Sequence, residues 1–228
     1  KRRLLTLSEG IVILSLRDQN ITTIGGMNLA SERAVREAPF FDCKSLLRVD
    51  LEGCTELTSV GDAAFYGCSY LTSVVLPDIL KQIGAGAFED CTSLMSVVLP
   101  DSLTQLGKGA FYKCSSLTSV VFPNSLTQMG NQAFQKCTSL VSVVLPDSLT
   151  QLGDAAFQDC TSLTSVVFPD SLTQLGEWAF GGCPSLTSVV LPDSLTQLGE
   201  GAFGECTSLM SVVMPVNITQ LGVAAFQN

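Results

Sequence analysis

Cysteine recurs at one fixed interval along most of this chain, and the residues between successive cysteines repeat with few changes. Seven such blocks begin, in order, at Cys68, Cys91, Cys114, Cys137, Cys160, Cys183 and Cys206, and the last block ends at Asn228. A fixed period in the range of roughly 20–50 residues indicates a repeat protein, because one block is too small to bury its own apolar side chains. Stacked neighbours must supply the core, so function is expected on a surface.

The first half of each block predicts a short strand. In the block that begins at Cys91, Leu94, Val97 and Leu99 have the L-x-x-L-x-L spacing of a leucine-rich repeat. Strands of successive turns pair in parallel in such repeats. Pro100 ends the strand, because proline has no N–H to donate to the ladder.

The second half of the block turns the chain back towards its start. Residues 103–107 carry a further inward pair of leucines, followed by Gly107, whose backbone can reverse direction. Ala110 and Phe111 then predict one short helical or 3₁₀ turn that directs the ring inward. Each block directs about six large apolar side chains inward, worth roughly 1.5–3 kcal/mol each when buried.

The whole pattern, C-x-x-L-x-x-V-x-L-P-D-x-L-T-Q-L-G-x-x-A-F-x-x, resembles the BspA-type leucine-rich repeats. Residues 145–163, LPDSLTQLGDAAFQDCTSL, have every fixed position of that family. The resemblance implies a β-rich solenoid, a right-handed superhelix with a parallel concave sheet and short strands or 3₁₀ turns on the convex side. It also implies adhesion and protein binding on microbial and protist surfaces, and it brings no catalytic residues.

The expected organisation is one continuous domain with three parts. Residues 1–42 form an N-terminal cap and an irregular first repeat, 43–67 a longer variant repeat, and 68–228 the seven regular repeats. Within the first part, 1–16 predict a capping strand and 29–37 one short helix.

The chain stops at Phe226-Gln227-Asn228 without a C-terminal cap. We therefore expect that the natural protein continues or that another molecule covers this end.

Composition narrows the class of partner. The net charge is −9, and the 12 lysines and arginines are scattered apart from Lys1-Arg2-Arg3. A nucleic acid is excluded as a partner because no basic stripe is present to neutralise phosphates. No apolar run reaches the roughly 18 residues of a membrane span.

The compartment stays open. The resemblance implies the cell surface or secretion, and an intracellular or organellar assembly is the alternative. Two sequons, at Asn20 and Asn217, permit glycosylation if the chain is secreted.

The positions of the cysteines predict a structural role in the core and no catalytic or metal-binding role. Eight of the nine occupy one column of the repeat, where neighbouring thiols point the same way and are poorly placed to form a bridge. There is no C-x-x-C pair and no histidine, which removes the usual zinc signatures, the Cys–His nucleophile and the Ser–His–Asp triad. We expect buried thiols and no cofactor or metal. Cys54 lies outside the column, and its alternatives are a reactive thiol or a bridge to Cys43 or Cys68.

One acidic residue follows the proline in most turns. These residues are Asp78, Asp101, Asp147, Asp170 and Asp193, with Asn124 between them. A ladder of carboxylates could bind calcium, which prefers several oxygen ligands. Aspartate after proline is also a common turn residue, and that interpretation is favoured because the calcium-binding nonapeptide repeat is absent.

Two columns of the strand are expected to face outward on the concave sheet, since side chains alternate along a strand. The first is valine: Val75, Val98, Val121, Val144, Val167, Val190 and Val213. The second is serine: Ser73, Ser96, Ser119, Ser142, Ser165, Ser188 and Ser211. An exposed apolar ribbon indicates a binding site. The alternative, that valine merely suits a strand, has equal weight.

The sequence therefore predicts a non-catalytic scaffold that binds a protein partner on its concave sheet, of the adhesion or recognition type. Trp178 replaces the Gly, Ala or Gln of other blocks, and is a candidate anchor on the convex side. The alternative function is a structural accessory subunit or spacer within a large multiprotein assembly, with contacts at the last turn and near Trp178.

Overall fold

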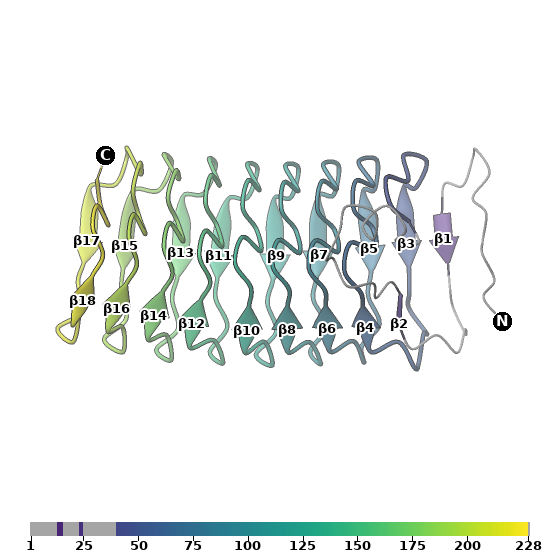
Figure 1. The fold of residues 1–228 in the computed structure, drawn as a ribbon, viewed down its shortest axis with the longest axis horizontal. Helices are drawn as coiled ribbons and strands as arrows, with labels where there is room; N and C mark the ends of the chain where they lie inside the picture. The colour runs from purple at the N-terminus through teal and green to yellow at the C-terminus, as the bar shows by residue number, and fades with distance from the viewer. Residues whose placement is uncertain (1–12, 16–22, 25–39, 228) are drawn as a thin grey trace.

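The chain winds into a solenoid of about eight turns. The computed structural model describes residues 13–15, 23–24 and 40–227. Figure 1 shows the turns side by side along one axis, with β1 (Ile13–Ser15) at one end and β17 (Ser211–Val213) at the other. The described residues contain strands and turns but no helix.

The first side of each turn is a three-residue strand. Between β1 and β17 these strands are β3 (Arg48–Asp50), β5 (Ser73–Val75), β7 (Ser96–Val98), β9 (Ser119–Val121), β11 (Ser142–Val144), β13 (Ser165–Val167) and β15 (Ser188–Val190). The pairs that these strands form are parallel, and equivalent residues of adjacent turns face one another, as Ser96 faces Ser119. Identical residues therefore form columns along the solenoid.

The second side is a two-residue strand, in the lower row of Figure 1. Its members are β2 (Thr23–Ile24), β4 (Ser59–Val60), β6 (Gln82–Ile83), β8 (Gln105–Leu106), β10 (Gln128–Met129), β12 (Gln151–Leu152), β14 (Gln174–Leu175), β16 (Gln197–Leu198) and β18 (Gln220–Leu221). These strands pair in parallel in two sheets, one from β2 to β10 and one from β12 to β18. In β8, Leu106 is buried and Gln105 is exposed, as alternation along a strand requires.

Pairing on the first side is interrupted after β9 and after β13. These two strands are followed by Phe122 and Phe168, where most other turns have leucine. The ring of Phe122 lies edge-on to Phe134 at 5.4 Å, and Phe168 lies edge-on to Phe180 at 5.6 Å. Both interruptions therefore coincide with a phenylalanine ring inserted after the strand.

The third side is a ladder of backbone hydrogen bonds through the turn that carries the Ala-Phe pair. The amides of Gly86, Phe88 and Asp90 donate to carbonyl oxygens of the next turn at 2.8–2.9 Å. Where the sequence predicts a short helical or 3₁₀ turn, the chain forms successive hydrogen-bonded turns. Gly86 and Asp90 both have a φ of 58°, and a left-handed residue at each end stops a helix from forming.

The core fills the space between the three ladders. One column of stacked phenylalanines runs through it, with ring centroids 5.1–5.6 Å apart and nearly parallel planes. This Phe column consists of Phe40, Phe65, Phe88, Phe111, Phe134, Phe157, Phe180, Phe203 and Phe226. Leucine and valine columns pack around it, and Leu94, Leu103 and Leu117 have no exposed surface. Each turn therefore buries its apolar residues against two neighbours.

The glycine after the second strand allows adjacent turns to approach closely. A Cβ placed on Gly107 would lie 2.5 Å from the backbone nitrogen of Ala85 in the preceding turn. Atoms of neighbouring backbones leave no space for a methyl group at this distance. This position needs glycine because of the close approach and not because of its φ angle.

The irregular N-terminal repeats join the same ladders. Strand β1 pairs with β3 at one edge of the first sheet, and β2 pairs with β4. In the longer variant repeat, Leu46, Val49 and Leu57 are buried like their counterparts in the regular repeats. The rest of the predicted capping strand and the predicted helix at 29–37 lie outside the described residues.

Candidate functional site

The outward surface of the three-residue strands is the candidate site, here called the strand face. It consists of the valine and serine columns of β5 to β17. Within one strand the two valines have opposite environments: Val97 is 2% exposed and Val98 is 69% exposed. In the paired strands the parallel register places outward valines side by side: Val98 lies beside Val121, Val144 beside Val167 and Val190 beside Val213.

Six of the seven valines predicted to face outward are between 52% and 69% exposed. They are Val98, Val121, Val144, Val167, Val190 and Val213, and Val75 is half-buried. The serines beside them, Ser96, Ser119, Ser142, Ser165, Ser188 and Ser211, are also exposed, and Ser73 is half-buried. The strand face is therefore a narrow apolar ribbon with a parallel line of hydroxyl-bearing residues.

A third column, just before the strand, widens the ribbon. Met95, Val141 and Met210 are exposed there. At the same position in another turn, Thr118 donates its hydroxyl to the carbonyl oxygen of Met95 at 3.1 Å. This bond ties the hydroxyl to the backbone of the preceding turn, as does the equivalent bond of Thr164 to Val141.

Carboxylates border the ribbon where each strand ends. The aspartates after the prolines, Asp78, Asp101, Asp147, Asp170 and Asp193, are all exposed, and so is Asn124. Within the described part of the chain, no three Asp, Glu, Cys or His side chains lie close enough to hold a metal ion. The acidic border is a source of negative potential beside an apolar surface.

The eight cysteines of the column are free thiols. Seven of them donate to a phenylalanine carbonyl oxygen of the preceding turn at 3.1–3.3 Å, as Cys137 does to Phe111. Burial raises the pKa of Cys160 to about 12 and the pKa of Cys114 well above its usual value. Because the thiolate is the reactive form, these groups serve the core and not chemistry.

Cys54, the cysteine outside the column, is only 1% exposed and packs in the core. Cys43 and Cys68, the two bridge partners that the sequence left open, are both free thiols. The predicted alternative of a disulfide between Cys54 and either residue is therefore wrong. The burial of Cys54 argues against the other alternative, a reactive thiol.

Trp178 is half-buried in the turn that carries the Ala-Phe pair. Its ring lies over glycines of its own turn and the next, since a Cβ placed on Gly201 would be 2.6 Å from the Cε2 atom of the indole. Gly181 and Gly204 line the same surface. The ring thus fills a space that glycines leave open, and its role as a partner anchor stays a prediction.

Asn217, in one of the two sequons, is exposed, and its side-chain amide donates to the carbonyl oxygen of Asp193 at 2.9 Å. Asn20 lies outside the described residues. Glycosylation stays a prediction at both positions.

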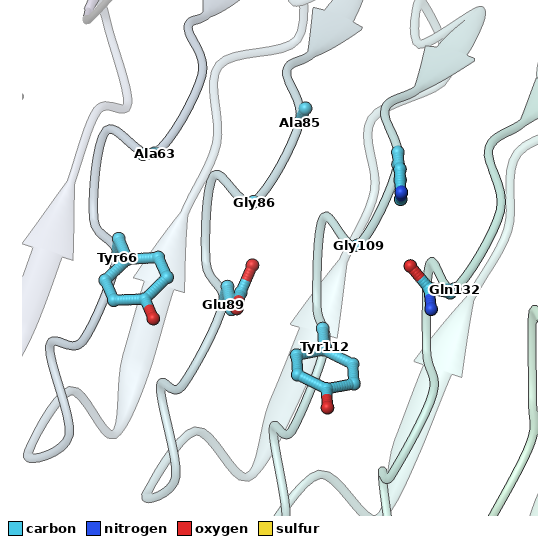
Figure 2. A pocket seen from close by; sticks show the side chains of 9 residues that line it. Ala63, Tyr66, Ala85, Gly86, Glu89, Gly109, Tyr112 and Gln132 are labelled. Atoms are coloured by element: carbon cyan, nitrogen blue, oxygen red, sulfur yellow. The ribbon is translucent and has the colours of Figure 1, made fainter. Parts of the chain in front are cut away.

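Sequence reasoning missed a groove of about 440 Å³ on the third side of the solenoid. Figure 2 shows Tyr66, Glu89 and Tyr112 on successive turns of this groove, with Gly86 and Gly109 beside them. The available signal was block-to-block variation, because the two positions after each Ala-Phe pair differ between repeats whereas the strand residues hardly change.

The part of the chain that the structure describes has no helix long and apolar enough to cross a membrane.

Comparisons with known proteins agree with this geometry. The chain matches the family described as BspA type leucine-rich repeat region, in six copies, over residues 33–160 and 128–228. A search of curated proteins found no significant match.

Three solved structures illustrate the likeness. A leucine-rich repeat protein of T. pallidum is 32% identical with a TM-score of 0.69, over 78% of this chain and 79% of that one. A leucine-rich cell surface protein of Faecalibacterium prausnitzii is 35% identical with a TM-score of 0.66, over 72% of this chain and 46% of that one. The pneumococcal vaccine antigen PcpA, 21% identical with a TM-score of 0.51 over 81% of this chain and 56% of that one, shares the fold.

The family match extends over nearly all the described repeats, and the T. pallidum protein is aligned over most of both chains. On these grounds, and on the parallel solenoid itself, the chain belongs to the BspA-type leucine-rich repeat family.

Proposed function

We propose that this chain is a non-catalytic scaffold that binds a protein partner on its strand face, in an adhesion or recognition role. The observation that carries the proposal is the row of exposed valines from Val98 to Val213, each more than half exposed. An apolar strip of this kind, repeated over six turns and bordered by polar groups, is typical of a protein-binding surface.

The proposal is also consistent with the chemistry of the strand face. It offers methyl groups and hydroxyls in a regular array, and the aspartate column lies at the strand ends. A partner with an apolar centre and basic residues at its rim fits this pattern, because complementary charge speeds association and sets orientation. The cell surface protein of Faecalibacterium prausnitzii offers a precedent for placement at a surface.

The test is capture of partners from the native source by immobilised chain, followed by identification and direct binding of the purified partner. The variant carries Val98→Lys, Val121→Lys and Val144→Lys. A matched control carries Gln105→Lys, Gln128→Lys and Gln151→Lys, which adds the same charge on the same three turns at exposed positions of the second ladder. Circular dichroism verifies both folds.

Loss of binding in the valine variant, together with binding retained by the glutamine variant, is the expected result. Equal binding by both variants and the wild type would contradict the proposal. That outcome would place the interface elsewhere and favour an accessory subunit of an assembly.

A further inference from the structure

The groove on the third side of the solenoid is formed by one column that changes character along the chain. The column begins with Phe41 and Tyr66, whose rings stack at 5.1 Å with planes 7° apart. Glu89 occupies the next turn and Tyr112 the one after it, and Figure 2 shows the two tyrosine rings in similar orientations. Glu89 thus interrupts a column of rings, and one ring position lies between Tyr66 and Tyr112.

Two of the residues that line the groove beside Glu89 are glycines. Gly86 and Gly109 have φ angles of 58° and 61°, and yet Ala63 and Gln132 adopt the same conformation in adjacent turns of this column. Since larger residues adopt this backbone conformation, its φ angle alone does not select glycine at 86 and 109. What the two glycines provide is space beside the carboxylate, because a Cβ on Gly86 or Gly109 would lie 3.1 or 3.7 Å from Oε2 of Glu89.

The charges around Glu89 leave it without a close cation. Among the described residues, no lysine or arginine lies within ion-pair distance of its carboxylate, whereas Asp90 pairs with Lys113 at 3.7 Å. Burial raises the pKa of Glu89 to about 7, the charge of Asp90 adds to this, and Lys113 and Lys108 oppose it. A partly desolvated carboxylate of this kind is stabilised by an incoming positive charge.

The tyrosine rings also suit a cation. The ammonium of Lys113 already lies 5.0 Å from the ring centroid of Tyr112. Ring faces carry negative potential and attract cations. Guanidinium is planar, weakly hydrated, able to stack on aromatic rings, and able to form two parallel hydrogen bonds with one carboxylate. The ammonium group of lysine carries the same charge, but it is not planar and cannot form two parallel hydrogen bonds with one carboxylate.

We propose that this groove binds the guanidinium group of an arginine side chain presented by a partner protein, with the group stacked between Tyr66 and Tyr112 and paired with Glu89. The strand face and the groove lie on different sides of the solenoid. This site therefore goes beyond the proposed function and stands or falls without it.

The first experiment titrates ¹⁵N-labelled chain with N-acetyl-arginine amide and follows amide shifts by NMR. Saturable shifts are expected at Gly86, Glu89 and Gly109. N-acetyl-citrulline amide, which is neutral and of the same shape, should give none there, and N-acetyl-lysine amide should bind several-fold more weakly. Equal responses to the arginine and citrulline probes, or to the arginine and lysine probes, would overturn the proposal.

The dependence on pH is a second readout. With a pKa of about 7, Glu89 is mostly ionised at pH 8 and mostly protonated at pH 6. Arginine-amide affinity should therefore fall about tenfold between pH 8 and pH 6, in proportion to the ionised fraction. Tyr66, whose pKa is raised by burial, stays protonated over this range. An unchanged affinity would contradict a role for the Glu89 carboxylate.

Variants complete the test. Glu89→Gln should abolish the shifts caused by the arginine amide, and Gly109→Ala should weaken them several-fold by narrowing the groove while the carboxylate and both rings remain. Glu205→Gln, at an exposed carboxylate of a distant turn, is the matched control and should bind as the wild type does. Tyr112→Leu, expected to weaken binding, is the substitute if Glu89→Gln loses its native spectrum. Arginine-specific shifts that persist in the Glu89→Gln variant, or wild-type affinity in the Tyr112→Leu variant, would overturn the assignment.

Discussion

The thiol of Cys114 donates a hydrogen bond to the carbonyl oxygen of Phe88, and the sulfur lies 3.2 Å from that oxygen. The two residues are 26 positions apart, so the bond joins consecutive turns. It gives a partner to a carbonyl next to the Phe column, as buried polar groups require. The cysteine column is therefore a hydrogen-bonded seam of the core, and its protonation state matters to the fold.

Alkaline pH should destabilise the chain through these thiols. Burial raises the pKa of Cys160 from 9.0 to about 12. The stability that the protonated thiol contributes is therefore complete below pH 9 and is lost as the pH rises towards 12. This thiol alone should cost about 2–3 kcal/mol of unfolding free energy between pH 8 and pH 11. Urea unfolding under reducing conditions measures the loss.

Cys160→Ala is the matched variant for this measurement. It should be less stable than the wild type at pH 8, but its stability should fall less steeply with pH because one titrating thiol is gone. Parallel pH profiles for the two chains would show that the buried thiol does not control alkaline unfolding.

Two glycines close together in one turn should respond differently to alanine. Gly107→Ala should cost at least about 3 kcal/mol, because the new Cβ would lie 2.5 Å from the backbone of the preceding turn. Gly109→Ala should cost only about 1–2 kcal/mol, the strain of a left-handed alanine, a conformation that Ala63 and Ala155 also adopt. Urea denaturation of both variants gives the comparison, and similar losses would contradict the close-approach argument.

Two adjacent valines of β11 should differ in how much stability a polar substitution costs. Val143, 1% exposed, points into the core, whereas Val144, 62% exposed, lies on the strand face. Val143→Thr buries a hydroxyl and should cost about 1–3 kcal/mol. Val144→Thr keeps a β-branched residue in water and should change stability by less than about 0.5 kcal/mol. Thermal and urea unfolding test the pair, and a larger loss for Val144→Thr would reverse the assigned orientation of β11.

Replacing a phenylalanine of the Phe column should cost more stability than replacing a phenylalanine outside it. Phe111 stacks on Phe88 and Phe134, each at 5.2 Å. Phe111→Leu removes both stacks and should cost about 1–3 kcal/mol beyond the lost area. Phe122→Leu restores the residue found in most other turns and should cost less than about 1.5 kcal/mol. Equal free energies of unfolding for the two variants would argue against a stacking contribution.

The period of the repeat predicted the fold class because apolar residues that recur at a fixed interval must stack into columns when the turns pack on one another. The alternation of Val97 and Val98 followed from strand geometry, and the phenylalanine and cysteine columns followed from spacing. The family resemblance and the solenoid are confirmed, while the partner-binding role of the strand face and of Trp178 stays a prediction.

Other features depended on neighbours one turn away. The third ladder forms because residues with left-handed backbone, such as Gly86 and Asp90, direct their amides at carbonyl oxygens of the next turn. The residue types at these positions vary between repeats, so the sequence did not predict this ladder. The sequence did not decide between a bridged and a reactive Cys54, and the structure shows that this residue is buried in the core.

The groove arises where Tyr66, Glu89 and Tyr112, each one repeat period from the next, meet on adjacent turns. The sequence by itself determined which side chains point inward, because one repeated pattern must satisfy one repeated core. Only the tertiary structure decided which variable residues become neighbours, because contacts between turns depend on the register of stacking.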